Sequence, residues 1–321
     1  MTRKIRNTVI LVKREITPGV DALPTGAANA VLVSEMSIDP LDAQNIERKN
    51  IRGSFGANAE LVGPASVKVS ITVELSGSGD AAVAPQWGQP LLGAGMAEGM
   101  LALPDRVEYT PVSTGLQSVT IYYFDADGVL HKITGAMGEC TLMAKVGELP
   151  MLKFDFTGID QGISATPNAI PVYDAWKPPV AMTKANVVDI TLGATYAAGA
   201  ITGGVAYPSN GLEIKFGNEV TFNANLSRET VDITDRAMTG SVELELTAAQ
   251  EVAFMAKVKA NELQSLAFSI GLSTGKRILI HAPAVQLSKP KKVDVKGVRY
   301  CGYETRYLPV SGNDELRLAC T

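Results

Sequence analysis

The amino-acid sequence predicts a mainly β protein made of two tandem β-sandwich or barrel-like domains, each with one short flanking helix. Three observations lead to this fold class. Apolar and polar residues alternate over several short segments, glycine and proline collect between those segments, and the order of expected elements occurs twice. At 321 residues the chain has room for two domains of roughly 150 residues each.

In the N-terminal half, the clearest strand covers residues 66–75, where every second position from Val67 to Leu75 is valine, isoleucine or leucine. Such alternation gives one apolar face and one polar face. Residues 119–134 form an expected hairpin, because two apolar segments flank a turn that contains Gly128. Residues 149–156 supply a closing strand.

The C-terminal half carries a similar series of segments. Expected strands cover residues 212–216, 241–246 and 293–303, and an expected hairpin covers residues 266–281 around a Ser-Thr-Gly turn. Helical spacing is scarce. Its best examples are residues 89–100 in the first half and residues 248–260 in the second, where Thr247 is available as the N-cap.

The two halves align as an internal repeat. An offset of 147 residues places Gln117 on Gln264 and the turn residue Gly128 on Gly275. Upstream, an offset of 171 places Ile71 on Val242, so the first half carries about 24 additional residues. The proline-rich stretch between the halves predicts a first domain at residues 1–158, a linker at 159–180 and a second domain at 181–321.

Composition excludes some classes of function. The net charge of −4 gives no basic field for holding nucleic acid, and the charged fraction of 19% is below the usual level of about 25%. A surface poor in charge indicates burial against partners. The first apolar run, Val9 to Val12, is too short for a signal peptide, and no run reaches the roughly 20 residues of a membrane helix. We therefore expect a protein that is made and kept in a cytoplasm.

The sequence gives little support for catalysis. His131 and His281 are the only histidines, and neither has the neighbours of a catalytic triad or a metal site. The glycine-rich segment 93–99 has the wrong spacing for a dinucleotide loop, and residues 125–128 lack the distal glutamate of a calcium loop. Three widely spaced cysteines indicate free thiols. We expect no enzyme, cofactor or metal.

Two long connections, residues 37–64 and 217–240, precede matching strands of the repeat. Long connections in compact domains are often functional. Both are charged, which predicts arms that reach a neighbouring subunit. The candidate contact residues are Glu47, Arg48, Arg52, Arg228, Glu229, Asp232, Asp235 and Arg236. The basic stretch 289–299 favours a solvated strand face or an inter-subunit salt-bridge surface.

Taken together, these features resemble the major tail tube proteins of long-tailed, siphovirus-like bacteriophages. The resemblance lies in the long connection before residues 66–75, the helix-forming segment 84–97, the hairpin 118–134 and the closing segment 147–156. Members of that family usually have one such domain and form hexameric rings. Two copies in one chain look like a duplicated variety in which three chains make a pseudo-hexamer.

The resemblance implies a structural subunit of the virion tail that is assembled in the host bacterial cytoplasm. Sheets of neighbouring subunits would join edge to edge, and rings would stack through the long connections. The candidate charged residues would then be inter-ring contacts. The lumen would hold the tape measure protein during assembly and pass DNA during ejection. Further partners would be the tail tip and terminator proteins.

Two other classes compete with this interpretation. A tube component of the type VI secretion kind normally has one domain, so the duplication argues against it. A tandem carbohydrate-binding β-sandwich, or another structural protein of a virion, would also fit the fold. Carbohydrate-binding domains usually display aromatic side chains, whereas aromatic residues are only 6% here and mostly occupy core-like positions.

Overall fold

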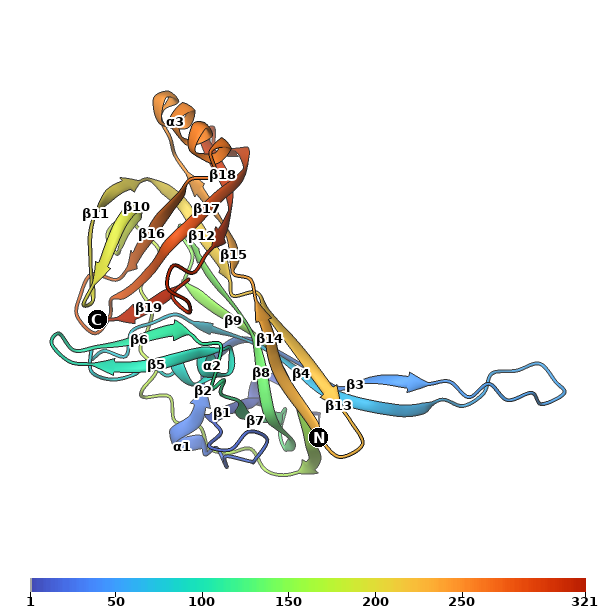
Figure 1. The fold of residues 1–321 in the computed structure, drawn as a ribbon. Helices are drawn as coiled ribbons and strands as arrows, with labels where there is room; N and C mark the ends of the chain where they lie inside the picture. The colour runs from blue at the N-terminus through green and yellow to red at the C-terminus, as the bar shows by residue number, and fades with distance from the viewer. Residues whose placement is uncertain (1) are drawn as a thin grey trace.

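The computed structural model describes residues 2–321, and the chain is mainly β, as the sequence predicts (Figure 1). The N-terminal half contains a 3-10 turn, η1 (Ile5–Asn7), and two short helices, α1 (Gly26–Asn29) and α2 (Gly88–Gly93). Its strands are β1 (Val9–Arg14), β2 (Ala30–Val31), β3 (Val33–Ile46), β4 (Leu61–Glu74), β5 (Met96–Leu101), β6 (Arg106–Pro111), β7 (Val119–Asp125), β8 (Val129–Lys145) and β9 (Met151–Ala165).

The C-terminal half contains one helix, α3 (Ala248–Lys259). Its strands are β10 (Val187–Ala197), β11 (Ala200–Tyr207), β12 (Ser209–Lys215), β13 (Asn218–Ala224), β14 (Glu229–Arg236), β15 (Thr239–Leu244), β16 (Leu263–Ile270), β17 (Ile278–Val295), β18 (Val298–Tyr307) and β19 (Arg317–Cys320). All strand pairs in the described residues are antiparallel.

Strands pair in the same order in the two halves. The first half gives β3–β4–β9–β8–β7–β1, and the second gives β12–β15–β18–β17–β16–β10. Even a local irregularity is shared, because the β3–β4 register shifts between Val33 and Glu35 and the β12–β15 register shifts between Ser209 and Gly211. Matching bulges at matching places fit the predicted repeat. The division at residues 158 and 181 stays a prediction, and β9 continues past residue 158 to Ala165.

One hydrophobic core runs through both halves. Its largest fully buried side chains include Trp87 and Phe154 from the first half and Phe216 from the second. Burying an aromatic side chain of this size stabilises the fold by about 2–3 kcal/mol. The long strands β8 and β17 link two layers, because their first residues pair with β7 and β16, and their later residues pair with β9 and β18. We call the layer that contains β9 and β18 the front layer.

The helix prediction is right for one segment and wrong for part of the other. In α3, Thr247 caps the helix and exchanges hydrogen bonds with Gln250, which forms a capping box. The expected helix at residues 89–100 is shorter, because α2 ends at Gly93 and β5 begins at Met96. Gly95 has φ +77°, a left-handed conformation that ends a helix and turns the chain into the strand.

The two long connections are β-hairpins, where the sequence suggested loops. We define arm 1 as residues 40–64, which extends β3 and β4 beyond the sheet, and arm 2 as residues 218–236, which contains β13 and β14. Figure 1 shows arm 1 projecting away from the molecule, whereas arm 2 lies along β8 and β9. The arms therefore occupy equivalent places in the strand order but have different surroundings.

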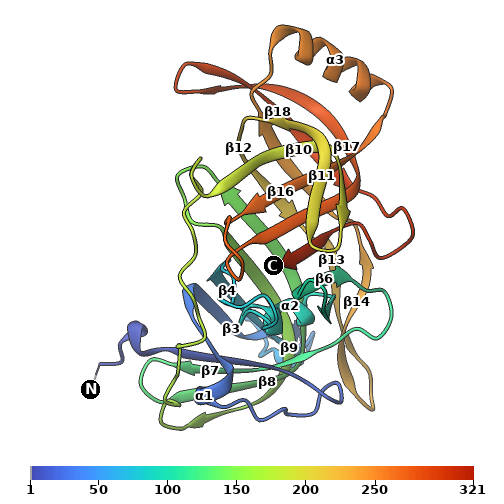
Figure 2. The ribbon, with the colours of Figure 1, turned by 90° about the vertical axis from the view of Figure 1, so that its left-hand side faces the viewer.

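The additional residues of the first half include the hairpin β5–β6. This hairpin pairs with β19, which also pairs with β17, as the position of the C-terminus in Figure 2 indicates. The last strand of the chain therefore ties the insertion of the first half to the second half.

Candidate assembly interface

The two halves join through the pairing of β8 with β12. Gly211 lies opposite Lys145 and Lys215 lies opposite Thr141. Between them, Leu212 and Ile214 are buried, so the joint combines a backbone ladder with apolar packing. We call this contact the inner joint. It produces one continuous antiparallel layer in the order β17–β18–β15–β12–β8–β9–β4–β3.

This layer ends in two open strand edges. Within residues 2–321, β3 pairs only with β4. At the other end, β17 pairs with β16 up to Gln286, and beyond that residue its only partner in the described chain is β18. An open edge presents unpaired backbone N–H and C=O groups and is a template for another strand. The chain thus offers one such edge at each end of the layer.

A polar cluster forms a second contact between the two halves, on strands other than those of the inner joint. Glu108 on β6 accepts hydrogen bonds from Arg106 Nε and the Tyr196 hydroxyl, both at 2.6 Å, and lies 3.2 Å from Arg317 Nε. Burial alone would raise the pKa of Glu108, but the bonds from Tyr196 and Arg106 and the charge of Arg317 outweigh it and lower the pKa. The carboxylate stays charged at neutral pH and connects β6, β10 and β19.

The base of arm 2 is anchored on β8. The Glu139 carboxylate accepts hydrogen bonds from the backbone N–H groups of Gly217 at 2.8 Å and Asn218 at 2.6 Å. Burial raises the pKa of Glu139, and these N–H donors partly offset that effect. Gly217 has φ +67°, and a Cβ there would lie 2.1 Å from the Ala237 carbonyl oxygen, so only glycine fits.

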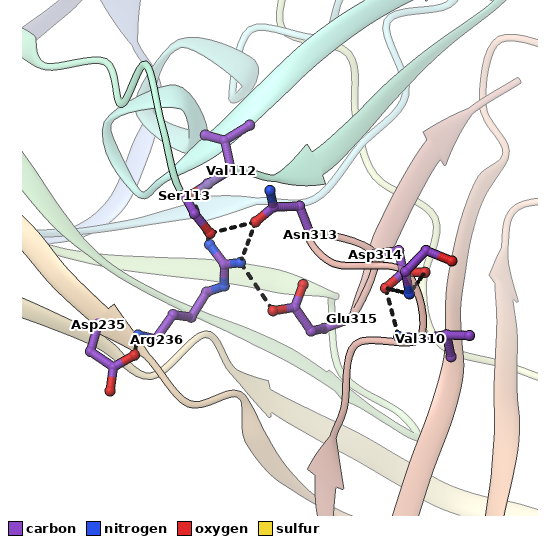
Figure 3. Close-up of polar contacts among 9 residues, drawn as sticks. Val112, Ser113, Asp235, Arg236, Val310, Asn313, Asp314 and Glu315 are labelled. Atoms are coloured by element: carbon purple, nitrogen blue, oxygen red, sulfur yellow. Dashed lines mark hydrogen bonds and ion pairs between the residues drawn. The ribbon is translucent and has the colours of Figure 1, made fainter.

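The second strand of arm 2 is held at the same base by Arg236, which lies opposite Asn218 (Figure 3). Its guanidinium forms an ion pair with Glu315 at 3.0 Å and donates to the Val112 carbonyl at 2.9 Å. Asn313 accepts from Arg236 at 3.2 Å and from the Ser113 hydroxyl at 2.5 Å. The Arg236 and Glu315 side chains are only 9% and 12% exposed, so this is a buried connection between the arm and both halves.

Arm 1 has few contacts with the rest of the chain. At its base Lys68 pairs with Asp42 at 2.6 Å, and further out Asn45 donates to Glu60 at 3.0 Å. Ile51 and Phe55 near the tip are fully exposed. Large apolar side chains held in solvent on a projecting hairpin mark a surface for protein contact.

The predicted contact residues therefore fall into two groups. Glu47, Arg48 and Arg52 lie exposed on arm 1, and Arg228, Glu229, Asp232, Asp235 and Arg236 lie on arm 2. The structure does not bring the two groups together. Arg236 is used within the chain, and the role of the others between rings stays a prediction. Glu108, Glu139 and Glu315 were missed, because their partners are distant in sequence and no local pattern indicates them.

The histidines pack against aromatic rings. The His131 ring lies 6.2 Å from that of Tyr123, and the His281 ring lies 5.8 Å from that of Tyr196. Burial lowers the pKa of both imidazoles. All three cysteines are buried free thiols. Over residues 2–321, no group of three His, Cys, Asp or Glu residues could hold a metal ion, and no helix is long and apolar enough to cross a membrane.

Open strand edges at both ends of one layer, together with a projecting arm, define a β-structured subunit of a self-assembling polymer. A family model described as phage tail tube protein matches residues 5–307. The chain belongs to the phage tail tube protein family, and its role is structural, as part of the tube in a virion tail. No curated protein sequence matches the chain.

Proposed function

We propose that the chain polymerises into stacked trimeric, pseudo-hexameric rings that form a conduit for DNA ejection. The observation that carries this proposal is the inner joint. In it, β12 of the second half adds to β8 of the first half, so two equivalent sets of strands already sit side by side in one chain.

The same joint can be repeated between chains. The strand order makes β17 the equivalent of β8, and β3 the equivalent of β12. Carried over by the strand registers of the two halves, the inner joint pairs residues 35–39 of β3 with residues 295–291 of β17 in the next chain. We call this contact the outer joint. Both of its strands have an open edge in the described chain.

Alternating inner and outer joints close a ring. Each chain supplies two places, so three chains give six positions around an axis, and both open edges of the layer are then paired. Closure also explains how a protein with two open edges avoids uncontrolled association, because a closed layer has no edge left. The duplicated domains at residues 1–158 and 181–321 would be the two places.

Stacking of the rings would use the arms. Glu47, Arg48 and Arg52 lie near the exposed tip of arm 1, and Arg228 and Glu229 lie near the tip of arm 2. The lumen would hold the tape measure protein and later pass DNA, and tail tip and terminator proteins would bind the ends. Assembly would take place in the host cytoplasm. A net charge of −4 favours passage of DNA over binding.

The outer joint is testable by disulfide formation between chains. In a Cys301→Ser background, Ser37→Cys on β3 is combined with Val293→Cys on β17, its expected partner in the outer joint, and assembled protein is oxidised. A pairing across adjacent strands places the two Cα atoms within the 7 Å that a disulfide tolerates. On a non-reducing gel we expect cross-linked dimers and trimers and no larger species.

Ser70→Cys combined with Val293→Cys is the matched control. Ser70 is the register partner of Ser37 on β4, so it lies one strand further from the outer joint and should not cross-link. Cross-linking that continues beyond three chains, or equal cross-linking through Ser70, would contradict the ring. Pairing Ser37→Cys instead with Lys291→Cys or Val295→Cys, the same-face neighbours on β17, tests for a shifted register.

A further inference from the structure

The second half has an open groove on the outer face of its front layer. It is formed by β12, β15, β17 and β18 and has a volume of about 630 Å³. Its charged lining residues are Glu213, Lys215, Lys289, Lys291, Glu304 and Arg306. In the described part of the chain, no segment crosses this groove as a lid.

The first half has a counterpart that arm 2 partly covers. That groove, of about 590 Å³, is lined by β3, β4 and β9, and its remaining wall is Val220, Phe222 and Ala224 of arm 2. Arm 2 reaches this place because β12 first pairs with β8 and the chain then crosses over β8 and β9. The same path, started from β3 in the outer joint, takes arm 1 across the open groove of the next chain.

The charges of the two surfaces are complementary. Four cationic side chains line the open groove against two carboxylates, and Lys289 and Lys291 share the single partner Glu304 at 2.6 and 3.6 Å. On β3, Glu35 and Asp39 are exposed and form no ion pair within residues 2–321. Met36 and Ile38 pack against the core, so the intervening acidic residues point to the outer face.

We propose, resting on the trimeric ring above, that this basic groove is the docking site for the base of arm 1 from a second copy of the chain. Glu35 and Asp39 supply the negative charge that the groove lacks, and arm 1 forms the wall that arm 2 forms in the first half. The projecting arm 1 of Figure 1 is then the unbound form of an element that is ordered against the neighbouring chain.

The outer joint differs from the inner joint in its chemistry. In the strand registers, Lys291 corresponds to Thr141, and Asp39 corresponds to Lys215, which lies opposite Thr141 at the inner joint. The outer joint therefore places Asp39 opposite Lys291, whereas the inner joint has no pair of opposite charges at this position. Exposed opposite charges guide association and are screened by salt. Ring formation should accordingly weaken as ionic strength rises, while the fold of the single chain is unaffected.

The experiment reverses charge on each side of the contact. Lys289→Glu/Lys291→Glu is compared with Lys184→Glu/Lys276→Glu, which makes the same change of net charge on exposed lysines outside the groove. Mass photometry gives the trimer dissociation constant at low and high salt. We expect the groove variant to weaken the trimer at least tenfold at low salt, and the control variant to change it less than threefold.

Adding Glu35→Lys/Asp39→Lys to the groove variant should restore at least half of the lost binding free energy, because the opposite charges are then exchanged. A thermal unfolding midpoint equal to that of the wild-type protein shows that each variant folds. If wild-type protein forms trimers and the two lysine double variants weaken the trimer equally, the groove assignment is wrong and the ring still stands. Absence of trimers in the wild-type protein would overturn the ring itself, and the groove assignment with it.

Discussion

Arm 1 and arm 2 occupy the same place in the strand order but differ in what they touch. Arm 2 is anchored on both of its strands, by Glu139 on β8 and by the buried pair of Arg236 with Glu315. Arm 1 has a surface ion pair at its base and exposed apolar residues at its tip. The difference shows what an arm of this fold does when its neighbour is present, because the first half serves as the neighbour for arm 2.

The comparison extends to the joints on which the arms depend. The inner joint has a backbone ladder and an apolar interior, and it forms within one chain at no translational cost. The outer joint would have to form between chains, where association costs several kcal/mol or more. A reversible, charge-dependent outer joint suits a subunit that has to remain separate until assembly begins.

The largest effect on folding is expected at the anchored end of arm 2. Arg236→Ala leaves the Glu315 carboxylate buried without its partner and should destabilise the chain by about 3 kcal/mol. Urea unfolding measures the change, and hydrogen exchange should show faster opening of β13 and β14. A loss below about 0.5 kcal/mol would mean that arm 2 is as weakly held as arm 1.

The Glu108 cluster should give the next largest effect. Glu108→Gln removes the charge that Arg106 and Arg317 share and should cost about 2 kcal/mol at pH 7. Thermal unfolding compares this variant with Glu213→Gln, whose ion pair with Lys215 is largely exposed and should contribute less than about 1 kcal/mol. Equal effects would contradict a special role of the cluster in joining the two halves.

The same cluster predicts the direction of a pH effect. Because the folded-state pKa of Glu108 lies below its ordinary value of 4.5, its contribution is complete above pH 4.5 and is lost as the pH falls through the folded-state pKa. The stability difference between wild type and Glu108→Gln should therefore shrink below pH 4.5. A difference that is constant from pH 7 to pH 3 would contradict this assignment.

The smallest effect on folding is expected in arm 1. Replacing residues 47–60 by a short glycine-containing turn removes side chains that are all exposed except the partly buried Asn58, and it should change stability by less than about 0.5 kcal/mol. The same deletion should abolish polymerisation, which electron microscopy of the concentrated protein would show. Normal tubes from the deletion variant would refute the role of arm 1 in assembly.

Local patterns predicted much of the fold. Period-two alternation located the strand at residues 66–75 and the hairpins at 119–134 and 266–281, because buried and exposed positions differ along a strand. The capping residue Thr247 located α3. The helix at residues 89–100 was overextended, since its apolar composition also suits β5 and the left-handed Gly95 gives no sequence signal beyond being glycine.

The contacts of the assembly surface could be predicted only in outline. Charge and length marked both connections as arms, but they did not distinguish the docked arm from the projecting one. That difference depends on Glu139, Glu315 and Asn313, which lie roughly 80 residues from their partners in arm 2 and come together only through the fold. The basic stretch at residues 289–299 was noted as a possible salt-bridge surface, and its geometry defines the groove.

The most direct test of the ring is the number of chains in one repeat of the assembled tube. Cryo-electron microscopy of tubes, combined with the mass of a single ring, measures this number. The outer joint predicts three chains and six similar β domains around the axis, with β3 of each chain beside β17 of the next. Six chains per ring, or a ring in which β3 and β17 of neighbouring chains are not adjacent, would contradict it.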